Sequence, residues 1–223
     1  VMIFFALKSK VHCVHAHDVS ALPVAFMISK LKRVPLIYDS HELWGESLHA
    51  FDSKTVIKLV VFVEKILARQ ASVIITVSKS IKTHLSSVFN ISHATVIRNI
   101  PSYTYKDNYD LFRETYNINK DSKILIYQGL IDISRGVDLI VDAAIHVCKS
   151  NEKCFFFILG DGPHIDELKE KVNKFNLTNR IIFFGYVKQS DLLKYTRSAD
   201  IGIHAIKNSC LNHSYCLPNK LFE

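Results

Sequence analysis

The chain has 223 residues, of which 48% are hydrophobic and 22% charged, and its formal net charge is +7. This composition provides enough apolar side chains for a packed core and excludes an intrinsically disordered chain. The longest apolar runs, residues 1–7 and 59–63, are too short to span a bilayer, and no basic segment precedes the first. The five cysteines show no CxxC spacing, which favours reduced thiols in a cytosolic compartment over a disulfide framework.

The positive charge is concentrated in the first half of the chain. Residues 1–98 hold 12 Lys and Arg against 6 Asp and Glu, a balance of +6, whereas residues 99–223 hold 16 against 15, a balance of +1. A basic half of this kind is compatible with an anionic membrane surface, a phosphorylated substrate or nucleic acid, or with a solvated lysine-rich surface. Nucleic acid is the least favoured partner, because no basic cluster is interleaved with aromatic residues.

Apolar runs and amphipathic segments alternate along the first hundred residues. This alternation is typical of an α/β fold with a parallel sheet. Strands are expected at residues 11–15, 34–38, 71–77 and 94–98. Helices are expected from residue 18 to about 32, at 53–70 and at 79–89, the last capped by Ser78.

A polar segment, residues 102–122, then separates this series from a second one. We expect a linker there with a short helix near 109–116. Strands follow at 124–128, 155–159, 181–184 and 200–204. Helices follow at 137–149, from Pro163 to about 172, at 189–196 and from about 217, with loops at 129–136 and 207–215. The sequence thus predicts a domain at 1–100, a linker at 101–122 and a domain at 123–223, with a ligand cleft between the domains beyond the strand ends.

One glycine turn stands out in the second half. The apolar run 155–159 suits a strand buried on both faces, and it ends in Gly160, Asp161, Gly162 and Pro163 before an amphipathic helix. We expect Pro163 to be the first helical residue. A strand, a glycine turn and a helix N-terminus can hold a nucleotide, but a tight turn without a ligand is equally compatible with the pattern. Asp166 and Glu167 in the first helical turn argue against a phosphate at that helix end.

Histidines and carboxylates follow the first two predicted strands. By residue type, His15, His17, Asp18, His41 and Glu42 could bind a metal. We expect no metal site, because we expect the rings of His15 and His17 to point to opposite faces of their strand. A hydrogen-bonded histidine at a strand end is the alternative for both residues.

Seven short motifs occur in an order and spacing that resemble the retaining GT-B glycosyltransferases of family four, a group that includes capsular-polysaccharide enzymes. The motifs span nearly the whole chain and are residues 14–18 (VHAHD), 38–42 (YDSHE), 127–129 with 135–138 (YQG, RGVD), 159–163 (LGDGP), 184–187 (FGYV), 198–202 (SADIG) and 217–223 (LPNKLFE). The resemblance implies two Rossmann-like doubly wound domains that face a cleft. It also implies a nucleotide-sugar donor held mainly by the C-terminal domain and an acceptor held mainly by the N-terminal one.

The resemblance also implies roles for three catalytic residues. His41 falls where the family places a histidine that contacts the transferred sugar, and a neutral imidazole can orient a sugar hydroxyl. Arg135 matches the basic residue that contacts the donor diphosphate, with Lys220 as its helper. Arg135 could instead be a surface arginine. The chain departs from the pattern at Leu130, where the family often has a second basic residue directly after the position of Gly129.

Further positions correspond to donor-binding residues of the family. Glu223 matches the second glutamate of a Glu-x7-Glu motif that hydrogen-bonds the ribose hydroxyls, and Tyr215 occupies the position of the first. Tyr186 and Val187 match residues beside the base, with core packing as the alternative. Gly129, Gly160 and Gly162 would keep the wall of the site close to the nucleotide.

From this resemblance we expect transfer of a hexose-type sugar from a nucleoside-diphosphate donor to a hydroxyl acceptor, with retention and without a cofactor or metal. A saccharide or lipid-linked acceptor, polysaccharide biosynthesis, and a cytoplasmic location with peripheral contact to the inner membrane face are further expectations. The alternatives are a non-catalytic sugar-nucleotide-binding module and an epimerase or phosphorylase of the same fold. We also expect the chain to be a fragment, with both domains incomplete, because the family pattern continues beyond both of its ends.

Overall fold

A computed structural model describes residues 2–47, 53–101 and 109–223 of the chain. The chain divides into two compact units. Unit 1 comprises Val1–Ile100 and Asn208–Pro218, and unit 2 comprises Pro101–Lys207 and Asn219–Glu223. The predicted domain limits at residues 100 and 122 stay a prediction, as does the cleft.

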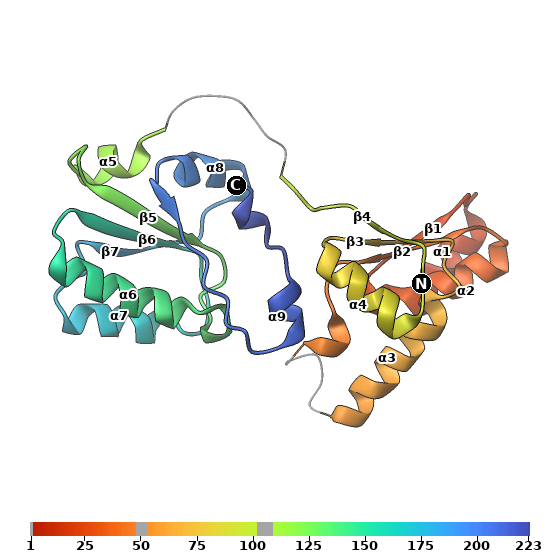
Figure 1. The fold of residues 1–223 in the computed structure, drawn as a ribbon. Helices are drawn as coiled ribbons and strands as arrows, with labels where there is room; N and C mark the ends of the chain where they lie inside the picture. The colour runs from red at the N-terminus through yellow and green to blue at the C-terminus, as the bar shows by residue number, and fades with distance from the viewer. Residues whose placement is uncertain (1, 48–52, 102–108) are drawn as a thin grey trace. The chain divides into compact units, whose positions relative to one another are not determined.

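Unit 1 is built on a parallel sheet with the strand order β1-β2-β3-β4 (Figure 1). The strands are β1 (Val14–His17), β2 (Leu36–Ser40), β3 (Val73–Thr76) and β4 (Ala94–Val96). The helices of this part of the chain are α1 (Met2–Lys8), α2 (Asp18–Lys32), α3 (Lys54–Ala68) and α4 (Lys79–Phe89), with a 3-10 turn, η1, at Trp44–Glu46. As predicted, the Ser78 side chain caps α4 by accepting a hydrogen bond from the Ile81 amide at 3.1 Å.

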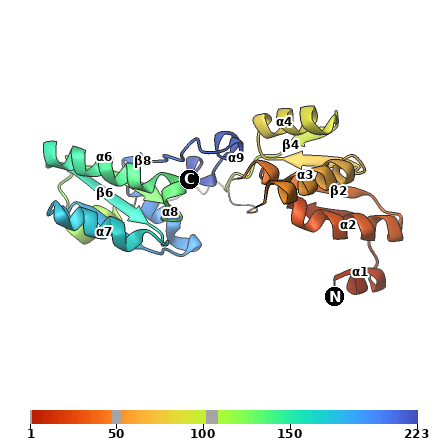
Figure 2. The ribbon, with the colours of Figure 1, turned by 90° about the horizontal axis from the view of Figure 1, so that it is seen from below.

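Helices α2, α3 and α4 lie on one face of this sheet (Figure 2). The residues of β1 and β2 that point towards these helices are buried, namely Ala16, Leu36, Tyr38 and Ser40. The alternate residues, His15 and His17 on β1 and Ile37 and Asp39 on β2, belong to the other face and are exposed or half-buried. The second face of the sheet therefore carries polar side chains that are accessible in the described structure.

The segment Asn208–Pro218, which interrupts unit 2 in the sequence, belongs to unit 1 and contains α9 (Leu211–Tyr215). Leu211 and Tyr215 pack against the unit 1 core, and the buried Asn212 accepts a hydrogen bond from the Leu43 amide at 2.9 Å. The prediction of a loop at residues 207–215 was therefore wrong for α9. The segment is too polar to show a helical apolar pattern, and its helix depends on contacts with residues far away in the sequence.

Unit 2 contains a second parallel sheet, with the strand order β7-β6-β5-β8. Its strands are β5 (Lys123–Gln128), β6 (Cys154–Leu159), β7 (Ile181–Gly185) and β8 (Ile201–Gly202). Helices α6 (Val137–Ser150) and α7 (Ile165–Lys174) pack on one face, and α5 (Leu111–Tyr116) and α8 (Gln189–Arg197) pack on the other (Figure 1). The central strand β6 is buried on both faces, which confirms the prediction from its unbroken apolar run.

Most element positions agree with the sequence, and the differences lie at the ends. Strand β1 begins at Val14 rather than Val11, and β8 is limited to Ile201–Gly202. Pro163 lies in a turn, and α7 begins at Ile165, so the expected helical start at the proline was wrong. The loop predicted at 129–136 contains the 3-10 turn η2 (Ile133–Arg135), and the helix expected from about residue 217 is the 3-10 turn η3 (Asn219–Leu221). Within the described residues, every helix is too short or too polar to cross a membrane.

Candidate functional site

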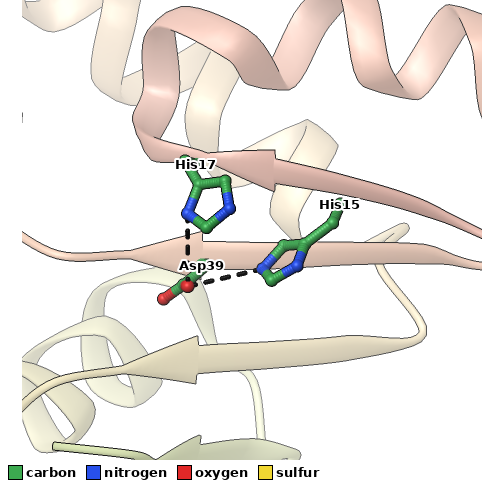
Figure 3. A group of neighbouring side chains, drawn as sticks. All are labelled: His15, His17 and Asp39. Carbon is green, nitrogen blue, oxygen red and sulfur yellow. Dashed lines mark ion pairs between the residues drawn. The ribbon is translucent and has the colours of Figure 1, made fainter. Parts of the chain in front are cut away.

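Three histidines surround one carboxylate at the carboxyl ends of β1 and β2. Asp39 Oδ2 lies 3.4 Å from His15 Nε2, 3.4 Å from His17 Nδ1 and 3.1 Å from His41 Nε2. Figure 3 shows His15 and His17 directed towards the same Asp39 oxygen. The register of the sheet explains this arrangement, because His17 pairs with Asp39 on the neighbouring strand. One side of unit 1 thus holds a group of side chains that can bind protons, hydroxyl groups or a cation.

The expectation that His15 and His17 point to opposite faces was wrong. Successive residues of a strand alternate between faces, so residues two apart share a face. The two imidazole rings stack with their centroids 4.3 Å apart and their planes at 25°. The argument against a metal site at these residues therefore fails.

His41 is held by the chain that follows β2. Its backbone amide donates to Asp18 Oδ1 at 3.0 Å, and its ring nitrogen Nε2 lies 3.4 Å from His17 Nδ1. Asp18 itself adopts a left-handed conformation with φ of 59°, which is uncommon for a residue other than glycine. The turn at Asp18 thereby positions His41 beside Asp39.

A buried pair lies on the helix-covered side of the same strand. The Tyr38 hydroxyl donates to Glu64 Oε1 of α3 at 2.5 Å, and Glu64 is only 3% exposed. Burial is the largest cause that raises the pKa of Glu64, to about 7, although the hydrogen bond from Tyr38 opposes the shift. Burial and the nearby Glu64 also raise the pKa of Tyr38 well above its usual value. This hydrogen bond connects β2, the strand that carries Asp39, to α3. Because the pKa of Glu64 is about 7, the strength of the connection depends on pH.

In unit 2, the predicted glycines lie where the loops after β5 and β6 touch. A Cβ atom on Gly160 would lie 1.9 Å from the Gly129 carbonyl oxygen, and one on Gly162 would lie 2.2 Å from the Ile131 carbonyl oxygen. Gly129 and Gly160 also have φ values of 138° and 130°. The contact between the two loops therefore accounts for the glycines at 160 and 162, independently of any ligand.

Cationic side chains converge on the turn at Gly129. Lys220 Nζ lies 4.5 Å from the centroid of the Tyr127 ring, and a Cβ on Gly129 would lie 2.6 Å from the same nitrogen. Burial, followed by the positive charges of Lys220 and Arg135, lowers the pKa of His204. Arg135 also acts on Tyr127, whose pKa burial raises to about 12. The charges of Arg135 and Lys220 therefore both act on His204, and Lys220 lies beside the Gly129 turn that follows β5.

His204 lacks hydrogen-bond partners within the described residues. Both of its ring nitrogens are buried, and neither makes a hydrogen bond there. A neutral imidazole beside two cations can donate a hydrogen bond to an anion, and an anion would also offset the repulsion that lowers its pKa. The three side chains together form a candidate anion site.

The carboxylate of Glu223 is positioned by hydrogen bonds that run through the buried Gln128. Gln128 Nε2 donates to Glu223 Oε2, and Gln128 Oε1 accepts a hydrogen bond from the Thr196 hydroxyl at 2.7 Å. Gln128 is 6% exposed and occupies the last position of β5. This network directs a carboxylate towards the same end of the sheet as the cationic cluster.

Tyr186 and Val187 differ in their surroundings. The side chain of Tyr186 is 77% exposed, which excludes core packing for that residue, whereas Val187 packs against the core on the α5 and α8 face. Both residues line an open hollow together with Phe184 and Tyr195. Tyr186 is thus available for a flat ligand such as a nucleotide base.

Unit 2 places Tyr186 and Val187 at a hollow whose lining includes none of its other predicted site residues. Arg135, Lys220 and Glu223 gather near the strand ends of unit 2, and His41 lies in the histidine cluster of unit 1. Sequence reasoning gave no role to Asp39, Gln128 or His204. Asp39 could have been found from its place one strand away from the histidines, but the partners of Gln128 and His204 come from distant segments.

The two halves of the chain match two protein families. Residues 2–100 match Glycosyltransferase Family 4, and residues 108–208 match Glycosyl transferases group 1. An uncharacterized glycosyltransferase of Methanocaldococcus jannaschii is 24% identical over 86% of this chain and 51% of its own length. The alpha-D-kanosaminyltransferase of Streptomyces kanamyceticus is 24% identical over 78% of this chain and 48% of its own.

Other similarities concern lipid enzymes and solved structures. The alpha-monoglucosyldiacylglycerol synthase of Acholeplasma laidlawii is 23% identical over 89% of this chain and 54% of its own length. The crystal structure of Anabaena HepE in complex with UDP covers 91% of this chain and 55% of its own, with 20% identity and a TM-score of 0.74. A HepE complex with UDP-glucose has a TM-score of 0.71. The chain thus has the GT-B α/β fold with two parallel sheets and spans about half the length of the relatives it matches.

Proposed function

We propose that the whole protein transfers a hexose-type sugar from a nucleoside-diphosphate donor to a hydroxyl acceptor with retention, because residues 2–100 match Glycosyltransferase Family 4 and residues 108–208 match Glycosyl transferases group 1. The observation that carries the proposal is the cationic cluster of Arg135, Lys220 and His204 beside the Gly129 turn. Two positive charges match the charge of a diphosphate. Solved neighbours of the same fold contain UDP and UDP-glucose, which supports a donor of this class.

Unit 2 holds the donor in this proposal. Arg135 and Lys220 bind the diphosphate oxygens, and Glu223, oriented by Gln128, accepts hydrogen bonds from the ribose hydroxyls. The exposed ring of Tyr186 lies beside the base. No cofactor is needed, because the bond that breaks is already activated by its phosphate leaving group.

The chemical step requires charge stabilisation more than a nucleophile on the protein. The bond between the anomeric carbon and the phosphate oxygen breaks, and its electron pair leaves with the nucleoside diphosphate. The acceptor oxygen forms a bond to the anomeric carbon on the same face, and its proton passes to the departing phosphate oxygen. Arg135 and Lys220 stabilise the negative charge that develops on the leaving group, and His41 orients the sugar through its hydroxyl groups.

A lipid-linked acceptor at an anionic membrane is part of the proposal. Helix α3 exposes an apolar stripe made of Val56, Leu59, Phe62 and Ile66. Lys54 and Lys58 are exposed on the same helix, so the surface combines apolar contact area with positive charge. A relative named alpha-monoglucosyldiacylglycerol synthase makes a lipid acceptor reasonable for this protein. The location implied is the cytoplasmic face of the membrane.

A sugar-nucleotide-binding module without transfer is the second candidate. Leu130 favours it, because this exposed residue occupies the position where the resembled family often has another basic side chain. A thermal-shift screen with UDP, GDP, ADP and their sugar conjugates tests donor binding. We expect one base to stabilise the protein, and a flat result for every nucleotide would contradict the proposal.

Transfer itself is tested by incubating the protein with the stabilising donor and lipid or saccharide acceptors, followed by NMR of the anomeric proton of the product. The proposal predicts the donor's anomeric configuration in the product. His41→Ala should abolish transfer and leave nucleotide binding intact, whereas loss of both would contradict the role of His41. Binding without transfer to any acceptor would favour the second candidate.

A further inference from the structure

We propose that His15, His17 and Asp39 form a binding site for a divalent transition-metal ion of the zinc class. These residues present one ligand atom each, and the three atoms lie within 4.8 Å of one another. They come from the adjacent strands β1 and β2 and converge on the Asp39 oxygen (Figure 3). The inference stands apart from the proposed transfer, because it requires neither a nucleotide nor an acceptor.

Two of the three distances between the ligand atoms agree with tetrahedral coordination. Zinc binds imidazole nitrogen and carboxylate oxygen at about 2.0–2.2 Å, and the edge of a tetrahedron is about 1.6 times that bond, or about 3.3–3.6 Å. The distances from Asp39 Oδ2 to His15 Nε2 and His17 Nδ1 are both 3.4 Å. An ion could therefore be inserted between these atoms with small side-chain rotations. Three protein ligands leave the fourth position for water or another group.

The charges around Asp39 support a cation at this position. The Asp39 side chain is only 13% exposed, and within the described residues its ion-pair partners are imidazoles, with neither Lys nor Arg among them. A positive charge close to a largely buried carboxylate stabilises its ionised form. The histidine side chains are 40% and 58% exposed, so the ion can reach the site from solvent.

The ligand set favours zinc-class ions over magnesium or calcium. Two imidazoles and one carboxylate suit zinc, nickel, copper or cobalt, whereas magnesium and calcium prefer oxygen ligands. His41 is a neighbour of this site, with Nε2 3.1 Å from the same Asp39 oxygen. A bound ion would therefore compete with His41 for Asp39, which places the metal next to the proposed sugar-orienting residue.

Isothermal titration of the chain with zinc chloride in a weakly coordinating buffer at pH 7 tests the proposal. We expect one zinc ion to bind, and we expect His15→Ala, His17→Ala and Asp39→Asn each to weaken binding at least about tenfold. His12→Ala is the matched control, because His12 is exposed just before β1 and takes no part in the cluster. An unchanged affinity in the ligand variants, or no binding to the wild type, would overturn the proposal.

A second measurement works on the wild-type chain and distinguishes this site from the five free cysteines. Titration with cobalt chloride should give the visible bands of a nitrogen- and oxygen-ligated tetrahedral ion, and zinc should shift the imidazole NMR signals of His15 and His17. Thiolate-to-cobalt absorption, or zinc shifts at other histidines instead, would contradict the assignment. Binding should also weaken on acidification, because imidazolium cannot bind a metal.

Discussion

The buried Glu64 predicts a pH-dependent stability of unit 1 that one substitution should remove. Glu64 is 3% exposed and accepts its hydrogen bond from Tyr38. Its pKa in the folded protein is about 7, against an ordinary value of 4.5. Between pH 4.5 and pH 7, the folded state therefore keeps a proton on Glu64 that the unfolded state has already released. Stability from this group is fully present below pH 4.5 and is lost as the pH rises through 7.

The size of the effect follows from the shift. The difference of 2.5 units between 7 and 4.5 corresponds to about 3 kcal/mol, at about 1.4 kcal/mol per unit. Between pH 5 and pH 8 the wild type should lose about 2 to 3 kcal/mol through this group. Glu64→Gln keeps the shape of the side chain and an acceptor for the Tyr38 hydroxyl but cannot ionise. The variant should therefore gain stability relative to the wild type as the pH rises.

Urea unfolding followed by the fluorescence of Trp44 measures this difference. Trp44 is the single tryptophan and lines the same small hollow as Glu64, so its signal reports on unit 1. Glu46→Gln is the matched control, because the Glu46 side chain is 47% exposed and its ion pair with His84 is long, at 4.0 Å. If the wild type and Glu64→Gln lose the same free energy of unfolding from pH 5 to pH 8, ionisation of Glu64 does not cause the loss of stability.

Three further predictions concern unit 2. Gly160→Ala should destabilise the protein by more than about 3 kcal/mol, because the added Cβ would meet the Gly129 carbonyl oxygen at 1.9 Å. Gly202→Ala should have little effect, because no atom of the described residues lies within 4 Å of the added Cβ. Thermal unfolding of both variants checks this difference, and equal melting temperatures would contradict it. Gln128→Ala should weaken the bound nucleoside diphosphate and its nucleoside alike in calorimetry, because it releases Glu223, and an effect on the diphosphate alone would argue against ribose binding. Nucleoside diphosphate should raise the pKa of His204, since an added anion offsets the charges of Lys220 and Arg135, and a histidine NMR titration without such a rise would place the anion elsewhere.

The α/β fold could be predicted because its signals are local. The apolar run of β6 indicates a strand buried on both faces, and Ser78 at the start of α4 is an ordinary helix cap. Helix α9 could not be predicted in the same way. Its position depends on the Asn212 side chain, which accepts from the Leu43 amide 169 residues away.

The parts of the candidate site that could be proposed from the sequence are residues such as Arg135 and Lys220, whose charge and position in a motif suggest a role by themselves. The charges of Arg135 and Lys220 both lower the pKa of His204, and the shared role of these two residues stays a prediction. The support of Glu223 by Gln128 and Thr196 is a tertiary contact that sequence spacing does not encode. Strand alternation alone predicts that His15 and His17 share a face. Because we expected opposite faces, the cluster with Asp39 was not predicted.

Calorimetric titration of the chain with nucleoside diphosphates and with the matching nucleosides tests the donor site most directly. One diphosphate should bind, and Arg135→Ala should weaken it about 30-fold, which corresponds to about 2 kcal/mol for a hydrogen bond to a charged group. The same change should leave the nucleoside unaffected, and Lys169→Ala, an exposed lysine on α7, should leave both unaffected. Equal weakening of diphosphate and nucleoside by Arg135→Ala, or no binding of any diphosphate, would contradict a donor site in unit 2.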